Sequence, residues 1–406
     1  MKKYDFESLI DRHNHDALAV DGIGKEPGFA PEPPKEGFDF IPMWVADQNF
    51  PTASSIVDAI IERAKHPAFG YFSPNDEYYN AIINWHKTQK GVSDITKEDI
   101  GYENGVLGGV VSALKVFAAP GDSVLVHSPT YVGFANALTM NGYNIVHSPL
   151  KRDNNGVWRM DYEDMDQKIK KYHIHVGIFC NPHNPCGRVW SKEEIEKAVE
   201  VYQANDCWII ADGIWSDLLM DNNHYTPVQS VNEWAHEHTL AFYAPSKTFN
   251  LAGLIGSYHI IYNKPIRERV QSISKKLIYN SMNVLSEHAL IGAYSDEGVN
   301  WLSQLLPVLT KNVDLAYGYV QNKFEGVTTF KTEGTYMMLL DCTEWLEKNN
   351  KTIDQLLKQG WDYGIGWQDG RQFDAPTSIR LNLASPTSQI KKAFDRMDKY
   401  VFNANW

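Results

Sequence analysis

Three polar segments each follow a short apolar run, and each carries a side chain that could take part in catalysis. The amide of Asn184 lies in NPHNPCGR, the carboxylate of Asp212 in ADGIWSD and the amine of Lys247 in APSKTFNLAGLIG. A lysine near a carboxylate is more often a structural ion pair than a reacting pair. However, a chance match to NPxNPxG in a chain of this length is rare, roughly one in ten thousand at average residue usage. The pattern therefore favours one common site.

The apolar runs before these segments are continuous and do not alternate with polar residues. Such runs occupy residues 123–127, 176–180, 207–211 and 240–243. Continuous apolar runs are typical of strands buried on both faces. A helical pattern with a capping box at Ser191 and Glu194 lies between two of them, which indicates parallel strands joined by a crossover. Because ligands bind at the carboxyl ends of such strands, we expect the three side chains to converge in one crevice.

The pattern changes beyond about residue 290, where helical stretches surround one short apolar run at residues 336–340. We predict an α/β fold with a large domain over residues 47–290, built on a mostly parallel sheet flanked by helices. A smaller α+β domain is expected over residues 291–406. Residues 1–46 contain the Pro/Gly-rich stretch GIGKEPGFAPEPPKEG, which disfavours regular structure, and are predicted to form an arm and a segment of the small domain.

Composition excludes several classes of protein. The chain has 38 basic and 50 acidic residues, a formal net charge of −12, which argues against a nucleic-acid partner because that affinity comes from neutralising phosphates. No run approaches about 18 apolar residues, so no membrane span is expected. Residues 1–16 lack the apolar core of a signal peptide, and the four cysteines form no CxxC pair. Both features favour a reducing, cytoplasmic location.

No metal site is expected. The histidine-rich pieces are pairs two residues apart, without carboxylates or cysteines at ligand spacing. These pairs are His13/His15, His173/His175 and His236/His238. The chain also lacks GxSxG, HExxH, GxGxxG and the phosphate-binding loop of nucleotide hydrolases.

The order of the polar segments resembles the fold-type I pyridoxal-phosphate enzymes of the class I/II aminotransferase group. NPHNPCG is followed by an aspartate 28 residues after Asn184, by SK 35 residues after Asp212, and by IRLN around Arg380. The segments PMWVADQNFP, FGYF and SPTYVGF are similar to the MalY/PatB branch of cystathionine β-lyases, which are C–S lyases. The resemblance covers most of the chain. It implies an aspartate-aminotransferase-like fold with a seven-stranded type of sheet, and pyridoxal 5′-phosphate as cofactor.

The resemblance implies a role for each matched residue. Lys247 would bind the cofactor aldehyde covalently and, once displaced by substrate, would act as general base on the Cα proton. Asp212 would face the pyridine nitrogen and keep it protonated, while Asn184 would donate to the ring phenolate oxygen. Tyr131 would stack on the ring as a further catalytic residue. Arg380 would hold the substrate α-carboxylate in a bidentate pair, with Asn184 as a second substrate contact.

The cofactor phosphate would need hydrogen-bond donors. Gly105, Val106 and Leu107 stand at the start of a helical pattern, where free backbone N–H groups bind anions. Ser246 could add a hydroxyl. Tyr71 would, by the resemblance, reach the phosphate of the neighbouring subunit, which implies a homodimer with shared active sites.

Four positions depart from the family pattern. Ala244 stands where Ser or Thr is frequent, and Ile255 where many members carry an arginine that clamps the phosphate. Trp215 replaces a tyrosine that supports the phenolate oxygen, and Gly213 replaces an acidic residue. We therefore expect the phosphate to be held by backbone groups and by Tyr71 of the partner subunit.

The products depend on the step that comes after removal of the Cα proton. With a leaving group at Cβ, a thiolate departs and the products are thiol, pyruvate and ammonia. Without one, return of the proton gives transamination or racemisation. The branch resemblance favours β-elimination from L-cystathionine or related cysteine S-conjugates, and the lack of a second obvious substrate arginine disfavours a dicarboxylate transaminase. An aminotransferase or racemase on the same scaffold, and a cofactor-holding regulatory or interaction protein, are the alternatives.

Overall fold

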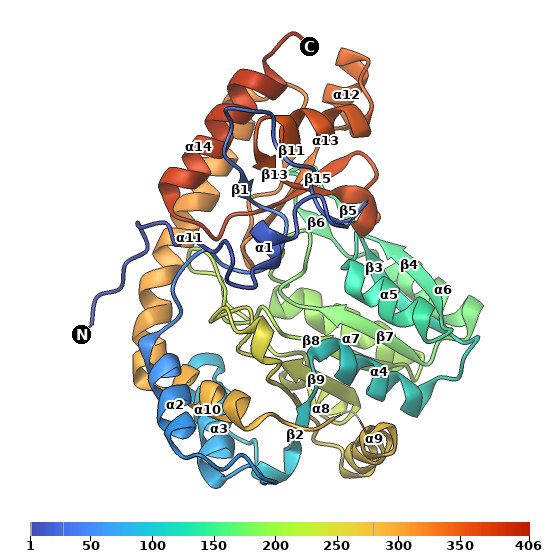
Figure 1. Cartoon of the computed structure of the whole chain (residues 1–406). Helices are drawn as coiled ribbons and strands as arrows, with labels where there is room; N and C mark the ends of the chain where they lie inside the picture. The colour runs from blue at the N-terminus through green and yellow to red at the C-terminus, as the bar shows by residue number, and fades with distance from the viewer. Residues whose placement is uncertain (1, 27, 279) are drawn as a thin grey trace.

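A seven-stranded sheet forms the centre of the larger, lower part of the molecule (Figure 1). The computed structural model describes residues 2–26, 28–278 and 280–406. The strand order is β2-β10-β9-β8-β7-β3-β4. The strands are β2 (Ile100–Glu103), β3 (Ser123–Ser128), β4 (Asn144–Pro149), β7 (Val176–Cys180), β8 (Trp208–Asp212), β9 (Thr239–Tyr243) and β10 (Ser257–Ile260).

Most neighbours in this sheet are parallel, as predicted. β4, β3, β7, β8 and β9 run in one direction, and β10 is antiparallel to β9 and β2. Every residue of β7 and β9 is buried, which explains their continuous apolar sequences. The predicted α/β class is confirmed.

Helices connect and flank these strands (Figure 1). The predicted capping box is present at the start of α7, where Ser191 accepts from the Glu194 N–H and Glu194 accepts from the Ser191 N–H. The helices of this part are α2 (Ser54–Lys65), α3 (Asp76–Lys90), α4 (Val106–Phe117), α5 (Val132–Met140), α6 (Tyr162–Tyr172), α7 (Lys192–Ala204), α8 (Glu233–His238), α9 (Lys264–Leu277) and α10 (Val284–Ala293).

A second, antiparallel sheet of order β11-β12-β15-β14 lies in the upper part of Figure 1. Its strands are β11 (Thr328–Thr329), β12 (Met337–Asp341), β14 (Gln368–Asp369) and β15 (Ser378–Asn382). The helices around it are α11 (Asp296–Lys323), α12 (Thr343–Asn349), α13 (Ile353–Asp362) and α14 (Thr387–Met397). The carboxyl-terminal residues therefore combine helices with an antiparallel sheet.

The amino-terminal arm joins this upper part. After the short α1 (Leu18–Asp21), strand β1 (Ile41–Pro42) pairs in parallel with β13 (Ile365–Gly366). A small hairpin, β5 (Lys151–Arg152) and β6 (Trp158–Arg159), completes the strands of the described residues. We keep the domain limits at residues 46/47 and 290/291 as a proposal.

In residues 2–26, 28–278 and 280–406, no helix combines the length and the apolar character that crossing a membrane requires. Within the same ranges, no group of three or more histidine, cysteine, aspartate or glutamate side chains could hold a metal ion. All four cysteines are buried and carry free thiols.

Candidate active site

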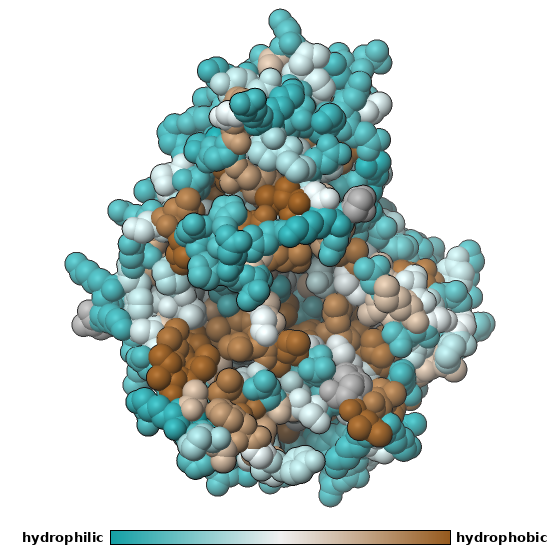
Figure 2. All heavy atoms as spheres, in the orientation of Figure 1, coloured by the Kyte–Doolittle hydropathy of each residue, from teal (hydrophilic) through white to brown (hydrophobic). Residues whose placement is uncertain are grey.

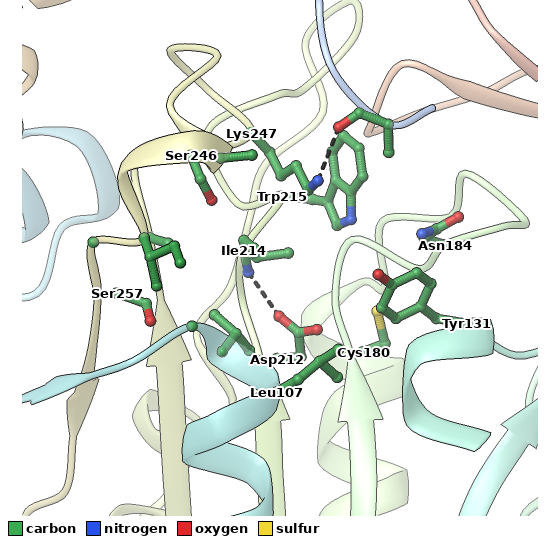
Figure 3. A pocket seen from close by; sticks show the side chains of 17 residues that line it. Leu107, Tyr131, Cys180, Asn184, Asp212, Ile214, Trp215, Ser246, Lys247 and Ser257 are labelled. Carbon is green, nitrogen blue, oxygen red and sulfur yellow. Dashed lines mark hydrogen bonds between the residues drawn. The ribbon is translucent and has the colours of Figure 1, made fainter. Parts of the chain in front are cut away.

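A cavity of about 290 Å³ opens at the carboxyl ends of β7, β8 and β9 (Figure 3). This volume is at the lower end of the range of roughly 300–1,000 Å³ for small-molecule sites. Nearly all the predicted site residues line it: Gly105, Val106, Leu107, Tyr131, Asn184, Asp212, Ser246 and Lys247. The structure therefore brings together the three strand-end segments, as the sheet topology requires.

Lys247 lies in the loop after β9, and its amine points into the cavity (Figure 3). Nζ donates a hydrogen bond to the carbonyl oxygen of Ala46 at 2.8 Å and lies 5.7 Å from the ring centroid of Trp215. Burial lowers the pKa of Lys247 to about 8. The lowered pKa gives this amine a larger neutral fraction near physiological pH than an ordinary lysine has, which makes it suitable as a nucleophile and as a base.

Asp212 is the last residue of β8 and is 5% exposed. Its Oδ1 accepts the N–H of Ile214 at 3.0 Å, and its other carboxylate oxygen has no hydrogen-bond partner among the residues that the structure describes. Burial raises the pKa of Asp212 to about 6. A cationic donor placed in the cavity would satisfy the second oxygen and stabilise the charged form.

Asn184 and Arg380 meet although they come from different sheets. Arg380 Nη1 donates to Asn184 Oδ1 at 3.1 Å, so the amide nitrogen of Asn184 is left facing the cavity on the side of Tyr131 (Figure 3). Arg380 Nη2 donates to the Trp44 carbonyl at 3.0 Å and to Gln368, and its buried Nε has no partner in the described residues. Arg380 thus lies behind Asn184 and does not line the cavity itself.

Tyr131 is the N-cap residue of α5 and lies on the wall of the cavity beside Asn184 (Figure 3). The ring packs closely against the helix, since a Cβ atom on Gly133 would lie 2.3 Å from a Tyr131 ring atom. Burial raises the pKa of Tyr131, so its phenol is neutral at physiological pH. The residue can present a neutral aromatic face or a hydroxyl donor to a ligand.

The opposite end of the cavity offers backbone and hydroxyl donors. Gly105 is the N-cap of α4 with φ of 81°, a conformation that favours glycine, and the first N–H groups of a helix have no partner within it. Ser246, Gly256 and Ser257 also line the cavity, and no arginine is among its described lining residues. The Ser257 hydroxyl already donates to the Glu103 carbonyl at 2.8 Å, which leaves Ser246 as the hydroxyl donor. Ser257 had no signal in the sequence, because only the antiparallel β10 brings it there.

The structure explains two of the departures from the family pattern. A Cβ atom on Gly213 would lie 2.5 Å from the ring of Tyr243 and 3.0 Å from the Tyr225 hydroxyl, so an acidic side chain has no room. Trp215 is buried and makes an edge-to-face contact with Tyr336, with ring centroids 4.8 Å apart. It forms part of the wall under the Lys247 amine.

Tyr71 lies outside this cavity. Its side chain has a relative exposure of 112% and faces a separate groove of about 800 Å³ that Phe69, Phe72 and Tyr102 also line. Tyr71 therefore makes no contribution to the site of its own chain. Its predicted contact with the phosphate of a neighbouring subunit stays a prediction.

Two buried histidines lie near the loop that carries Asn184. Burial lowers the pKa of His127 to about 4 and that of His183 to about 3. Both values lie below the ordinary histidine pKa near 6.5, so below pH 6.5 the unfolded chain binds more protons than the folded chain. Stability is therefore lost as the pH falls from about 6.5 toward the folded-state pKa values.

For His127 this loss amounts to about 2 kcal/mol of unfolding free energy between pH 7 and pH 5. We expect His127→Gln to remove that part of the acid sensitivity, measured by urea unfolding at the two pH values. Asp212, whose pKa is raised, changes the pH dependence of the unfolding free energy in the opposite direction. This contribution is the same in the wild type and the variant, so the difference between the two proteins in their loss of stability reports on His127 alone. An unchanged loss in the variant would contradict the prediction.

The sequence profile of the aminotransferase class I and II family matches residues 44–397. The chain belongs to this family. It is 31% identical to cystathionine β-lyase PatB of Bacillus subtilis over 87% of this chain and 92% of that protein. It is 27% identical to protein MalY of Escherichia coli over 96% of each. Cystalysin of Treponema denticola, whose crystal structure contains pyridoxal 5′-phosphate, superposes with a TM-score of 0.89 at 27% identity over 98% of this chain and 99% of that one.

Proposed function

We propose that the chain is a pyridoxal 5′-phosphate-dependent C–S β-lyase that converts L-cystathionine or related cysteine S-conjugates to thiol, pyruvate and ammonia. The observation that carries the proposal is the convergence of Lys247, Asp212 and Asn184 on one cavity in a chain whose relatives include a cystathionine β-lyase. The substrate class is a small amino acid with a sulfur leaving group at Cβ.

The residues of the cavity fit this cofactor. The Asp212 carboxylate oxygen that has no hydrogen-bond partner among the described residues matches a protonated ring nitrogen, and the N–H groups at the start of α4 match a phosphate. The Lys247 amine, with its lowered pKa, matches an aldehyde. When bound, the cofactor supplies an electron sink for the electrons that remain after the Cα proton leaves.

The chain's own groups bind, orient and move protons. Arg380 fixes the Asn184 amide and provides the charge for the substrate α-carboxylate, which would replace one of its present acceptors. The Ala46 carbonyl holds the Lys247 amine over Trp215, and this amine takes the Cα proton at Nζ. In the net reaction, water adds, the Cβ–S bond breaks and the sulfur leaves as a thiol.

The aminotransferase alternative is less well supported. Dicarboxylate substrates need a second cation besides Arg380, and apart from Lys247 no cationic side chain lines the cavity among the described residues. Incubating the purified protein with L-cystathionine and measuring pyruvate and free thiol tests the proposal. Pyruvate and thiol in equal amounts would support a lyase, whereas keto-acid-dependent amino transfer without pyruvate would replace it with an aminotransferase.

Arg380→Lys is expected to lower kcat/KM for L-cystathionine by about a hundredfold, mostly through KM. The reason is that an ammonium retains the charge but loses the bidentate hydrogen bonds to a carboxylate and the contact that orients Asn184. Steady-state kinetics of pyruvate release measure the effect. A variant with unchanged KM would show that the substrate carboxylate binds elsewhere.

We also propose a cytoplasmic homodimer with shared sites. Apolar side chains gather over α2 in Figure 2, where Val57 and Ile61 are exposed, and Phe69 and Tyr71 follow on the next loop. A second copy covering this surface would place the partner's Tyr71 at a cofactor phosphate. The absence of disulfides among the described cysteines suits a reducing compartment.

A further inference from the structure

A short segment between the two sheets is held by many hydrogen bonds, several of which its backbone carbonyls accept. We call residues 44–48 the strap. Each of its five carbonyl oxygens accepts a hydrogen bond from a side chain outside the strap. Trp44 accepts from Arg380 at 3.0 Å, Val45 and Asp47 each from Asn382 at 2.6 Å, Ala46 from Lys247 at 2.8 Å and Tyr336 at 3.0 Å, and Gln48 from Asn250 at 2.9 Å. The strap therefore fixes the resting position of the Lys247 amine.

The amino-terminal arm is bound to this strap through the ion pair between Arg12 and Asp47. Arg12 Nη1 and Nη2 donate to the two carboxylate oxygens of Asp47 at 3.1 and 2.5 Å, and Nη1 also donates to Asn49 Oδ1 at 2.9 Å. The two side chains are only 17% and 16% exposed. A bidentate, largely buried pair of this kind is stronger than an exposed one. Arg12 is thus attached to the residue next to Ala46.

Asp47 also acts on Lys247 through its charge. The charged groups that face the lysine amine are Asp47 on the strap, Arg380 on β15 and Asp212 on β8, and of these three Asp47 has the largest influence on the Lys247 pKa. The Asp47 carboxylate favours the ammonium form. The Arg12 guanidinium is bound to that carboxylate and carries the opposite charge.

We propose that Arg12 is a positioning residue for Lys247, which holds the Asp47 carboxylate so that the Ala46 carbonyl and the balance of charge beside the lysine amine are both fixed. The inference rests on the part of the proposed function that makes Lys247 the reacting amine, and it is independent of the substrate and of the reaction type. It gives the arm a role in setting the reactivity of the site.

The test measures the reactivity of the Lys247 amine directly. The cofactor-free full-length chain is labelled with acetic anhydride between pH 6 and 10, and acetylation of Lys247 is quantified by peptide mass spectrometry against the other lysines of the same digest. Arg12→Gln exposes the charge of Asp47 and should raise the pKa of Lys247 by about one pH unit. Asp47→Asn removes that charge and should lower it by a similar amount. Arg12→Lys keeps the charge and should give nearly the wild-type value.

One control variant and the direction of the two pKa shifts separate this role from a merely structural one. Lys151→Gln removes an exposed cation from its ion pair with Asp161 and should leave the pKa of Lys247 unchanged. If Arg12 only anchors the arm, Arg12→Gln and Asp47→Asn break the same pair and shift the pKa in the same direction, or not at all; either result would overturn the proposal. Because the reagent is neutral and no cofactor is present, failure of the lyase proposal leaves this result interpretable.

Discussion

Replacing Lys247 by alanine is expected to lower the rate of pyruvate release from L-cystathionine by at least about a thousandfold, since general-base catalysis alone contributes 10²–10⁴. The same change removes the only amine that lines the cavity in the described part of the chain. Coupled detection of pyruvate measures the rate. Borohydride reduction of the wild-type protein should fix a pyridoxyl group on Lys247 and on no other lysine.

The loss is expected without unfolding. Lys247 makes a single side-chain hydrogen bond, to the Ala46 carbonyl, and its ammonium form is disfavoured by burial. Thermal unfolding of the cofactor-free variant should therefore match that of the cofactor-free wild type. Lys151→Ala, in an exposed ion pair, serves as a control that should keep full activity. Substantial pyruvate release by Lys247→Ala would show that another group removes the proton.

The positions of Asn184, Asp212 and Lys247 could be predicted because one rule covers all three. Each lies at the carboxyl end of a buried strand or in the loop just after it, and the ends of parallel strands meet at the same edge of a sheet. All three strands could be recognised in the sequence from their uninterrupted apolar residues. Local sequence was therefore sufficient for this part of the site.

Other parts of the site depend on contacts between distant elements. The Ala46 group that accepts from Lys247 is a backbone carbonyl, which every residue has, so the residue type gives no hint of it. The contact between Arg380 and Asn184 forms only when the two sheets pack together. The reason for Gly213 is likewise tertiary, because Tyr243 and Tyr225 fill the space of a side chain there. No periodicity or spacing in the sequence encodes these contacts.

A buried ion pair beneath the lysine loop gives the largest expected effect on stability. Asp217 Oδ1 accepts from Lys90 and, at 3.1 Å, from Trp85 Nε1, while Asp217 Oδ2 accepts from the Thr248 hydroxyl at 2.8 Å. The side chains of Lys90 and Asp217 are 2% and 4% exposed. Lys90→Met leaves the Asp217 carboxylate buried and without its cation, which should lower the unfolding free energy by about 3–5 kcal/mol. Urea unfolding at pH 7 measures the loss.

The double variant Lys90→Met/Asp217→Asn distinguishes an unpaired charge from lost packing. The amide that this variant carries in place of the Asp217 carboxylate is neutral and can still accept from Thr248, so the double variant should be more stable than Lys90→Met alone. Lys65→Met, in the exposed pair with Glu62, should have no measurable effect. Equal destabilisation of the single and double variants would mean that the loss comes from the contacts of the Lys90 ammonium with the rings of Tyr225 and Tyr243, and not from an unpaired charge on Asp217.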